Sequence, residues 1–131
     1  MNLPWLRWSA STLLRIACLA LAASMVWGLF HIGAKPIAVG LFPPPWDYLA
    51  HFATFGALSA LLAITFGPHR LWWALPCTAL VGALDELHQR GLPGRSATWE
   101  DFAMDILGGL IGVWLLSVLL ARSKLFNQTP A

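Results

Sequence analysis

Residues 99–121 read WEDFAMDILGGLIGVWLLSVLLA, with three acids in the first seven positions and then sixteen residues without a charge. An apolar stretch of this length is typical of a transmembrane helix. Carboxylates at the start of such a helix are costly in a membrane unless they have partners, so they mark a candidate functional region. This stretch therefore predicts a membrane fold and indicates the end of the molecule at which a site lies.

The rest of the chain has the same apolar character. Of its 131 residues, 58% are hydrophobic and 11% are charged, and the mean hydropathy of +0.67 lies outside the range of soluble domains. We predict four spans over residues 13–32, 46–66, 71–87 and 99–121, joined by short connections rich in glycine and proline. The expected fold is an all-α bundle of four transmembrane helices, forming a single domain over residues 1–131. Its surroundings are the lipid bilayer, and no basic run indicates nucleic acid as a partner.

The basic residues predict the orientation. With four crossings both termini lie on one side, which carries five of the basic residues: Arg7, Arg15, Arg70, Arg122 and Lys124. The other side carries three: Lys35, Arg90 and Arg95. Cytoplasmic ends of spans are enriched in lysine and arginine, so we predict cytoplasmic termini. All six acids then lie at the outer end of the bundle: Asp47, Asp85, Glu86, Glu100, Asp101 and Asp105.

The sequence from Asp85 to Gln89, DELHQ, needs a special explanation. Its acids lie at the C-terminal end of the third span, where the helix dipole opposes a negative charge. We expect Asp85 or Glu86 to form hydrogen-bonded ion pairs with Arg90 or Arg95. An ion-pair network that only holds the third span to the fourth is the structural alternative to a functional site.

The acids of the second and fourth spans have simpler interpretations. Asp47 and His51 are four residues apart, within hydrogen-bonding reach on one helical face, and Asp47 can also complement the dipole of the first turn. The motif Thr98-x-x-Asp101 resembles a capping box. Asp105 is too deep to cap the helix, so it requires a partner from another span.

Small residues on the second and fourth spans predict close helix packing. Gly108 and Gly112 form a Gly-x-x-x-Gly motif, and Gly56 and Ala60 form a related pattern on the second span. Small residues at this spacing allow helix backbones to approach closely in a membrane. We expect a tightly packed bundle.

Taken together, these motifs resemble the VanZ-like family of small bacterial membrane proteins. The resemblance covers about residues 46–115 and depends on Asp47-Tyr48-x-x-His51, Asp85-Glu86-x-x-Gln89, Gly94-Arg95 and Asp101-x-x-x-Asp105 followed by Gly108 and Gly112. The namesake is associated with low-level resistance to teicoplanin, so the resemblance implies a multi-pass protein of the bacterial cell membrane with a role in the envelope and in antibiotic resistance. The family usually has lysine in place of Tyr48 and asparagine in place of Asp105, and both differences make this site more acidic.

We interpret the polar residues as one outward-facing ligand site, formed by Asp47, His51, Asp85, Glu86, His88, Gln89, Arg95, Asp101 and Asp105. The ligand expected is an envelope lipid, a cell-wall precursor or a glycopeptide-like molecule. Arg90 and Arg95 suit phosphate or carboxylate, and His51 and His88 are adjustable donors. This interpretation favours a binding protein over an enzyme and includes no cofactor.

Two other functions use the same residues. The acids and histidines offer oxygen and nitrogen ligands for a divalent cation, so a metal-dependent membrane enzyme acting on a lipid or cell-wall substrate is the alternative. No compact metal motif such as His-Glu-x-x-His is present. Proton-coupled transport through the acids and histidines is a third hypothesis, which the four short spans and the lack of a charge near mid-membrane disfavour.

Overall fold

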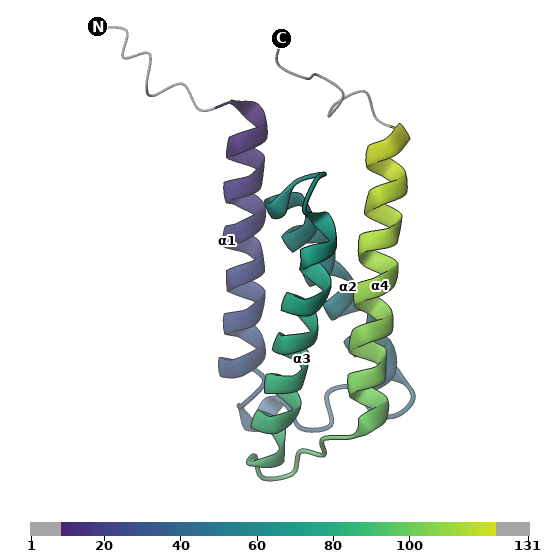
Figure 1. The fold of residues 1–131 in the computed structure, drawn as a ribbon. Helices are drawn as coiled ribbons and strands as arrows, with labels where there is room; N and C mark the ends of the chain where they lie inside the picture. Colours follow the sequence, from purple (N-terminus) through teal and green to yellow (C-terminus); the bar gives the residue numbers. More distant parts are fainter. Residues whose placement is uncertain (1–8, 123–131) are drawn as a thin grey trace, which may run out of the picture.

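The computed structural model describes residues 9–122, and these residues form four long helices (Figure 1). In chain order they are α1 (Ala10–His31), α2 (Trp46–Phe66), α3 (Ala74–Arg90) and α4 (Trp99–Arg122), with short 3-10 turns η2 (Pro36–Ala38) and η3 (Leu71–Trp73). The described part of the chain contains no strand. The predicted all-α four-helix fold is confirmed.

The helix boundaries lie close to the predicted ones. The predicted bounds of the second span coincide with α2. The first helix starts three residues before the predicted position because the Ser9 side chain accepts a hydrogen bond from the backbone N–H of Thr12. The third span begins with η3, and α3 follows from Ala74 to Arg90. Pro76 is tolerated there because the first turn of a helix needs no N–H donor.

The helices have the length and surface of membrane spans. Three of them, α1, α2 and α4, are long and apolar enough to cross a membrane. The shorter α3, with 17 residues, rises about 25 Å and runs alongside them between the same two ends (Figure 1). Large apolar side chains such as Leu13, Leu19 and Leu119 are exposed on the outside of the bundle, as expected of a surface that contacts lipid. The protein is a multi-pass membrane protein.

The chain direction alternates from helix to helix, so α1 begins and α4 ends at the same end of the bundle (Figure 1). The opposite end contains the loops 32–45 and 91–98, the starts of α2 and α4, and the end of α3. We call it the polar end, because all six acids lie in these segments or in the adjoining helical turns. Arg7 and Lys124, which contribute to the basic count, lie outside the described residues. The orientation of the termini across the membrane stays a prediction.

The closest helix pair is α2 and α4. A Cβ atom at Gly108 would overlap the carbonyl oxygen of Phe52, and one at Gly112 would overlap the carbonyl oxygen of Gly56. The two backbones therefore touch along the small-residue motif, as membrane helices do where glycines face each other.

A buried hydrogen bond reinforces the same contact. The Ser59 hydroxyl on α2 donates to the carbonyl of Gly109 on α4 at 2.9 Å, and Ser59 is fully buried. Phe55 and Leu58 on α2 are also fully buried and pack towards α1 and α3. This helix pair sets the positions of the polar side chains nearer the polar end.

Candidate functional site

An ion pair between α2 and α4 lies at the centre of the polar end. The Nδ1 atom of His51 is 2.8 Å from Oδ1 of Asp105, and Asp105 is fully buried. The internal partner that the sequence requires for Asp105 is thus His51. Of the two roles left open for Asp47, a bond to His51 or a place in the first turn of α2, the structure shows the second. The close α2–α4 contact places the Asp105 carboxylate beside the imidazole instead.

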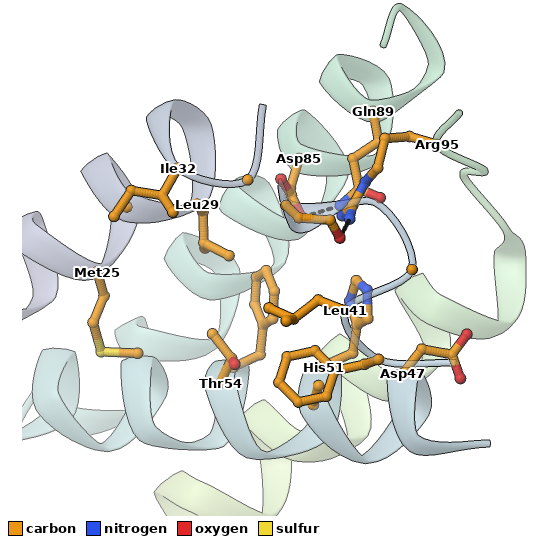
Figure 2. Close-up of a pocket in the computed structure, with 17 residues that line it drawn as sticks. Met25, Leu29, Ile32, Leu41, Asp47, His51, Thr54, Asp85, Gln89 and Arg95 are labelled. Carbon is orange, nitrogen blue, oxygen red and sulfur yellow. Dashed lines mark hydrogen bonds between the residues drawn. The ribbon is translucent and has the colours of Figure 1, made fainter. Parts of the chain in front are cut away.

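Asp47 has a local role at the start of α2. One of its carboxylate oxygens accepts a hydrogen bond from the backbone N–H of Tyr48 at 2.9 Å. The carboxylate points away from His51 and Asp85 (Figure 2). Asp47 lies at the margin of the site, in the first helical turn where a negative charge is favourable.

Among residues 9–122, no lysine or arginine forms an ion pair with the acids of α3. The Gln89 side-chain amide donates to Oδ2 of Asp85 at 2.7 Å, and both residues are buried. Glu86 is only 6% exposed, and within the described part of the chain neither of its carboxylate oxygens has a hydrogen-bond partner. The side chains of Asp85 and Gln89 are one turn apart on α3, so the amide reaches the carboxylate within the helix.

The predicted ion pairs of Asp85 or Glu86 with Arg90 or Arg95 are therefore wrong. Arg90 is exposed, and Nη1 of Arg95 donates to the backbone carbonyl of Ala38 at 3.0 Å. Within residues 9–122, the ion pair between His51 and Asp105 is the only one. The loop 32–45 crosses the polar end of the bundle and brings the Ala38 carbonyl to the Arg95 guanidinium. The spacing of residues in the sequence gives no indication of this contact.

Thr98 caps α4, and Asp101 keeps one oxygen unused. The Asp101 backbone N–H donates to Oγ1 of Thr98 at 3.1 Å, and the Thr98 hydroxyl donates to Oδ2 of Asp101 at 2.7 Å. Thr98 thus caps α4 as expected, but the Asp101 carboxylate accepts from the Thr98 hydroxyl and not from the backbone N–H that a capping box uses. Asp101 is 5% exposed, and Oδ1 has no partner.

His88 contacts α1 through its ring. Its ring packs against Phe30 of α1 with 5.2 Å between ring centroids, and its Nδ1 atom is buried without a hydrogen-bond partner. The structure places His88 on the side of α3 that faces α1. It does not bring His88 into contact with His51, as a single cluster would require.

Four of the predicted site residues form a compact group. His51, Asp85 and Glu86 each contribute one nitrogen or oxygen atom, and these three atoms all lie within 4.8 Å of one another. Asp105 joins them through its bond to His51. We call His51, Asp85, Glu86 and Asp105 the acidic centre. It brings one imidazole and three carboxyl groups from α2, α3 and α4 into a buried space.

A cavity of about 360 Å³ opens beside the acidic centre (Figure 2). One part of its lining is apolar and comes mainly from α1 and the following loop: Met25, Leu29, Ile32, Leu41 and Phe42, with Phe55 from α2. The other part is polar: Asp47, His51, Thr54, Asp85, Gln89 and Arg95. The cavity therefore has a mixed apolar and polar lining.

Sequence reasoning missed the contribution of α1 and its loop to this cavity. Met25, Leu29 and Ile32 recur at the spacing of one helical face, which was a usable signal. Nothing in the sequence of residues 33–42 indicates that this loop contacts Arg95. The contact exists because the path of the loop brings the Ala38 carbonyl to the guanidinium.

The family model of VanZ/LLP1 matches residues 6–120 of the chain. The match includes α1 as well as the segment 46–115 on which the resemblance was based, and it covers every site residue described above. Comparisons with curated proteins and with solved structures gave no match.

Proposed function

This chain belongs to the VanZ/LLP1 family, and from that premise we propose that it binds the headgroup end of an envelope amphiphile, either a membrane lipid or a lipid-linked cell-wall precursor. The observation that carries the proposal is the division of the cavity lining into an apolar part and a polar part. The protein acts in the bacterial cell membrane, with the polar end outside and the termini in the cytoplasm.

The volume of the cavity limits how much of a ligand can bind inside it. A volume of about 360 Å³ is near the lower end of the roughly 300–1,000 Å³ of small-molecule sites. A whole diacyl or polyprenyl lipid does not fit. A headgroup with the first few carbons of its chain does, and the remaining chain would lie in the surrounding bilayer.

Arg95 supplies the charge that would select the headgroup. A guanidinium has five N–H donors, and the bond to Ala38 uses one of them. The remaining donors suit a phosphate or carboxylate group held in two places at once. Arg90, which the sequence suggested as a second anion donor, does not line this cavity. Selection of an anionic headgroup therefore depends on Arg95.

Binding of two matched lipids to the purified chain in detergent tests the proposal. We expect a short-chain phosphatidylglycerol to bind more tightly than a diacylglycerol of the same chain length, as measured by native mass spectrometry. Arg95→Gln should remove this preference. Arg90→Gln is the matched control, because it removes the same charge at the same end of the bundle outside the cavity.

A cellular measurement complements the binding assay. If expression of the chain changes sensitivity to teicoplanin or another envelope stress, Arg95→Gln should abolish the change at normal protein abundance, and Arg90→Gln should retain it. Equal binding of the two lipids, or equal effects of the two arginine variants, would contradict headgroup recognition by this cavity.

A further inference from the structure

The acidic centre carries more negative charge than its neighbours can balance. Three carboxyl groups are buried there, at 2%, 6% and 0% exposure for Asp85, Glu86 and Asp105. Among the described residues, the one basic side chain bonded to any of them is the imidazole of His51, which is a cation only when protonated. A buried carboxylate without a partner is strongly unfavourable, so an additional positive charge or bound protons must be present.

The carboxylate oxygens without a hydrogen bond indicate where an additional positive charge would bind. Both oxygens of Glu86 and Oδ2 of Asp105 are buried without a hydrogen bond. One ring nitrogen of His51 and one carboxylate oxygen each of Asp85 and Glu86 lie within 4.8 Å of one another. Neighbouring ligands of one Zn²⁺ or similar cation, bound at about 2.0–2.2 Å, lie about 3–4 Å apart. The three atoms can therefore reach one ion if each moves inward by less than about 1 Å.

The imidazole is held in the orientation that a metal ligand needs. Because Nδ1 of His51 is bonded to Asp105 at 2.8 Å, Nε2 is the nitrogen left to coordinate. Histidine ligands of metals regularly donate their second ring N–H to a carboxylate, which fixes the tautomer and the ring orientation. Asp105 plays that role here as a positioning residue.

Gly82 on α3 permits this arrangement. A Cβ atom at this position would lie 2.9 Å from Oδ2 and 3.3 Å from Cβ of Asp105. A glycine therefore allows Asp105 to approach α3 closely enough to support His51. In the same way, Gln89 supports Asp85 through its hydrogen bond to Oδ2.

We propose that His51, Asp85 and Glu86 form a binding site for one divalent transition-metal cation, Mn²⁺ or Zn²⁺, with Asp105 orienting His51. One imidazole and two carboxylates suit these ions, whereas Ca²⁺ and Mg²⁺ prefer oxygen ligands alone. Two carboxylates balance the charge of the ion. Three protein ligands leave coordination positions open, and His51 and Asp85 both line the 360 Å³ cavity. The site does not depend on the proposed headgroup binding.

Metal binding by the full chain in detergent is the direct test. After removal of metal with EDTA, titration with Mn²⁺ alone, followed by electron paramagnetic resonance, should show one bound ion per chain. Glu86→Gln and Asp85→Asn should weaken binding by at least about tenfold, as losses around metal sites do. Glu100→Gln is the matched control, since Glu100 is an exposed acid at the same end.

A thermal unfolding measurement separates loss of the site from loss of the fold. Added Mn²⁺ should raise the melting temperature of the wild type and of Glu100→Gln but not that of Glu86→Gln. Without metal, Glu86→Gln should be at least as stable as the wild type, because the amide removes a charge that lacks a partner.

Three outcomes would overturn the proposal. The first is a wild-type chain that binds neither Mn²⁺ nor Zn²⁺ stoichiometrically, which would mean that protons alone neutralise the acidic centre. The second is equal metal binding by the wild type and Glu86→Gln. The third is an equal loss in Glu100→Gln, which would indicate adventitious binding to surface acids. Failure of lipid binding in the separate assay would leave the metal site unaffected.

Discussion

Gly108→Ala should destabilise the bundle, because the contact between α2 and α4 leaves no room for a methyl group. Besides overlapping the carbonyl oxygen of Phe52, the new Cβ would lie 2.9 Å from its carbonyl carbon and 3.0 Å from its Cα. These are backbone atoms of α2, so the clash is relieved only if the helices separate. Overpacking of this kind costs about 1–3 kcal/mol.

Gly28→Ala in α1 is the matched control. Nothing lies within 4 Å of a Cβ atom at this position. Replacing a helical glycine with alanine favours the helix by about 0.5–1 kcal/mol when no clash opposes it. This preference is common to both variants, so the difference between their free energies of unfolding isolates the clash and should be about 1–3 kcal/mol.

Reversible unfolding in mixed micelles, with increasing SDS and helicity followed by circular dichroism, measures these free energies. Gly28→Ala should be as stable as the wild type or more stable, and Gly108→Ala should be less stable than Gly28→Ala by the stated amount. If both variants gain the same stability, the backbones of α2 and α4 do not touch at Gly108, and the position of Asp105 beside His51 loses its structural basis.

Two further predictions concern the arginines and the topology. Arg95→Ala should cost about 1–3 kcal/mol in the same unfolding assay, because it removes a hydrogen bond from a charged group to the Ala38 carbonyl. Arg122→Ala removes an exposed charge and should change stability by less than about 0.5 kcal/mol, so equal effects would refute the anchoring role of Arg95. In intact cells, on a background without Cys18 and Cys77, an impermeant thiol reagent should label a cysteine at position 92 but not at 129. The reverse pattern would overturn the predicted orientation.

The difference between the expected and observed partners of Arg95 has a simple physical origin. Sequence spacing correctly indicates that Asp85, Glu86 and Arg95 belong to the same end of the bundle. It gives no information on the loop 32–45, whose carbonyl at Ala38 takes the guanidinium. Without that arginine, Glu86 remains unpartnered among the described residues, and this is one of the observations on which the proposed cation site rests.

His51 on α2 is a second residue whose partner could not be predicted from sequence spacing. Its spacing from Asp47 is a property of one helix and can be read from the sequence. Its contact with Asp105 joins residues 54 positions apart and requires the backbone contact at Gly108. The sequence did predict that Asp105 needs a partner, because its depth in an apolar helix is a local property. That this partner is His51 depends on how α2 and α4 pack against each other.

The sequence alone determined the helical class, the membrane environment, the approximate bounds of the four helices and the gathering of six acids at one end. These features depend on local hydropathy, capping and turn residues, which act within a few positions along the chain. The tertiary structure alone decided which acids meet, which remain without partners and which apolar residues complete the cavity. The small-residue spacing indicated that α2 and α4 pack closely. The remaining outcomes depend on the rotation of each helix about its axis and on the path of the loop after α1, and neither is encoded in local spacing.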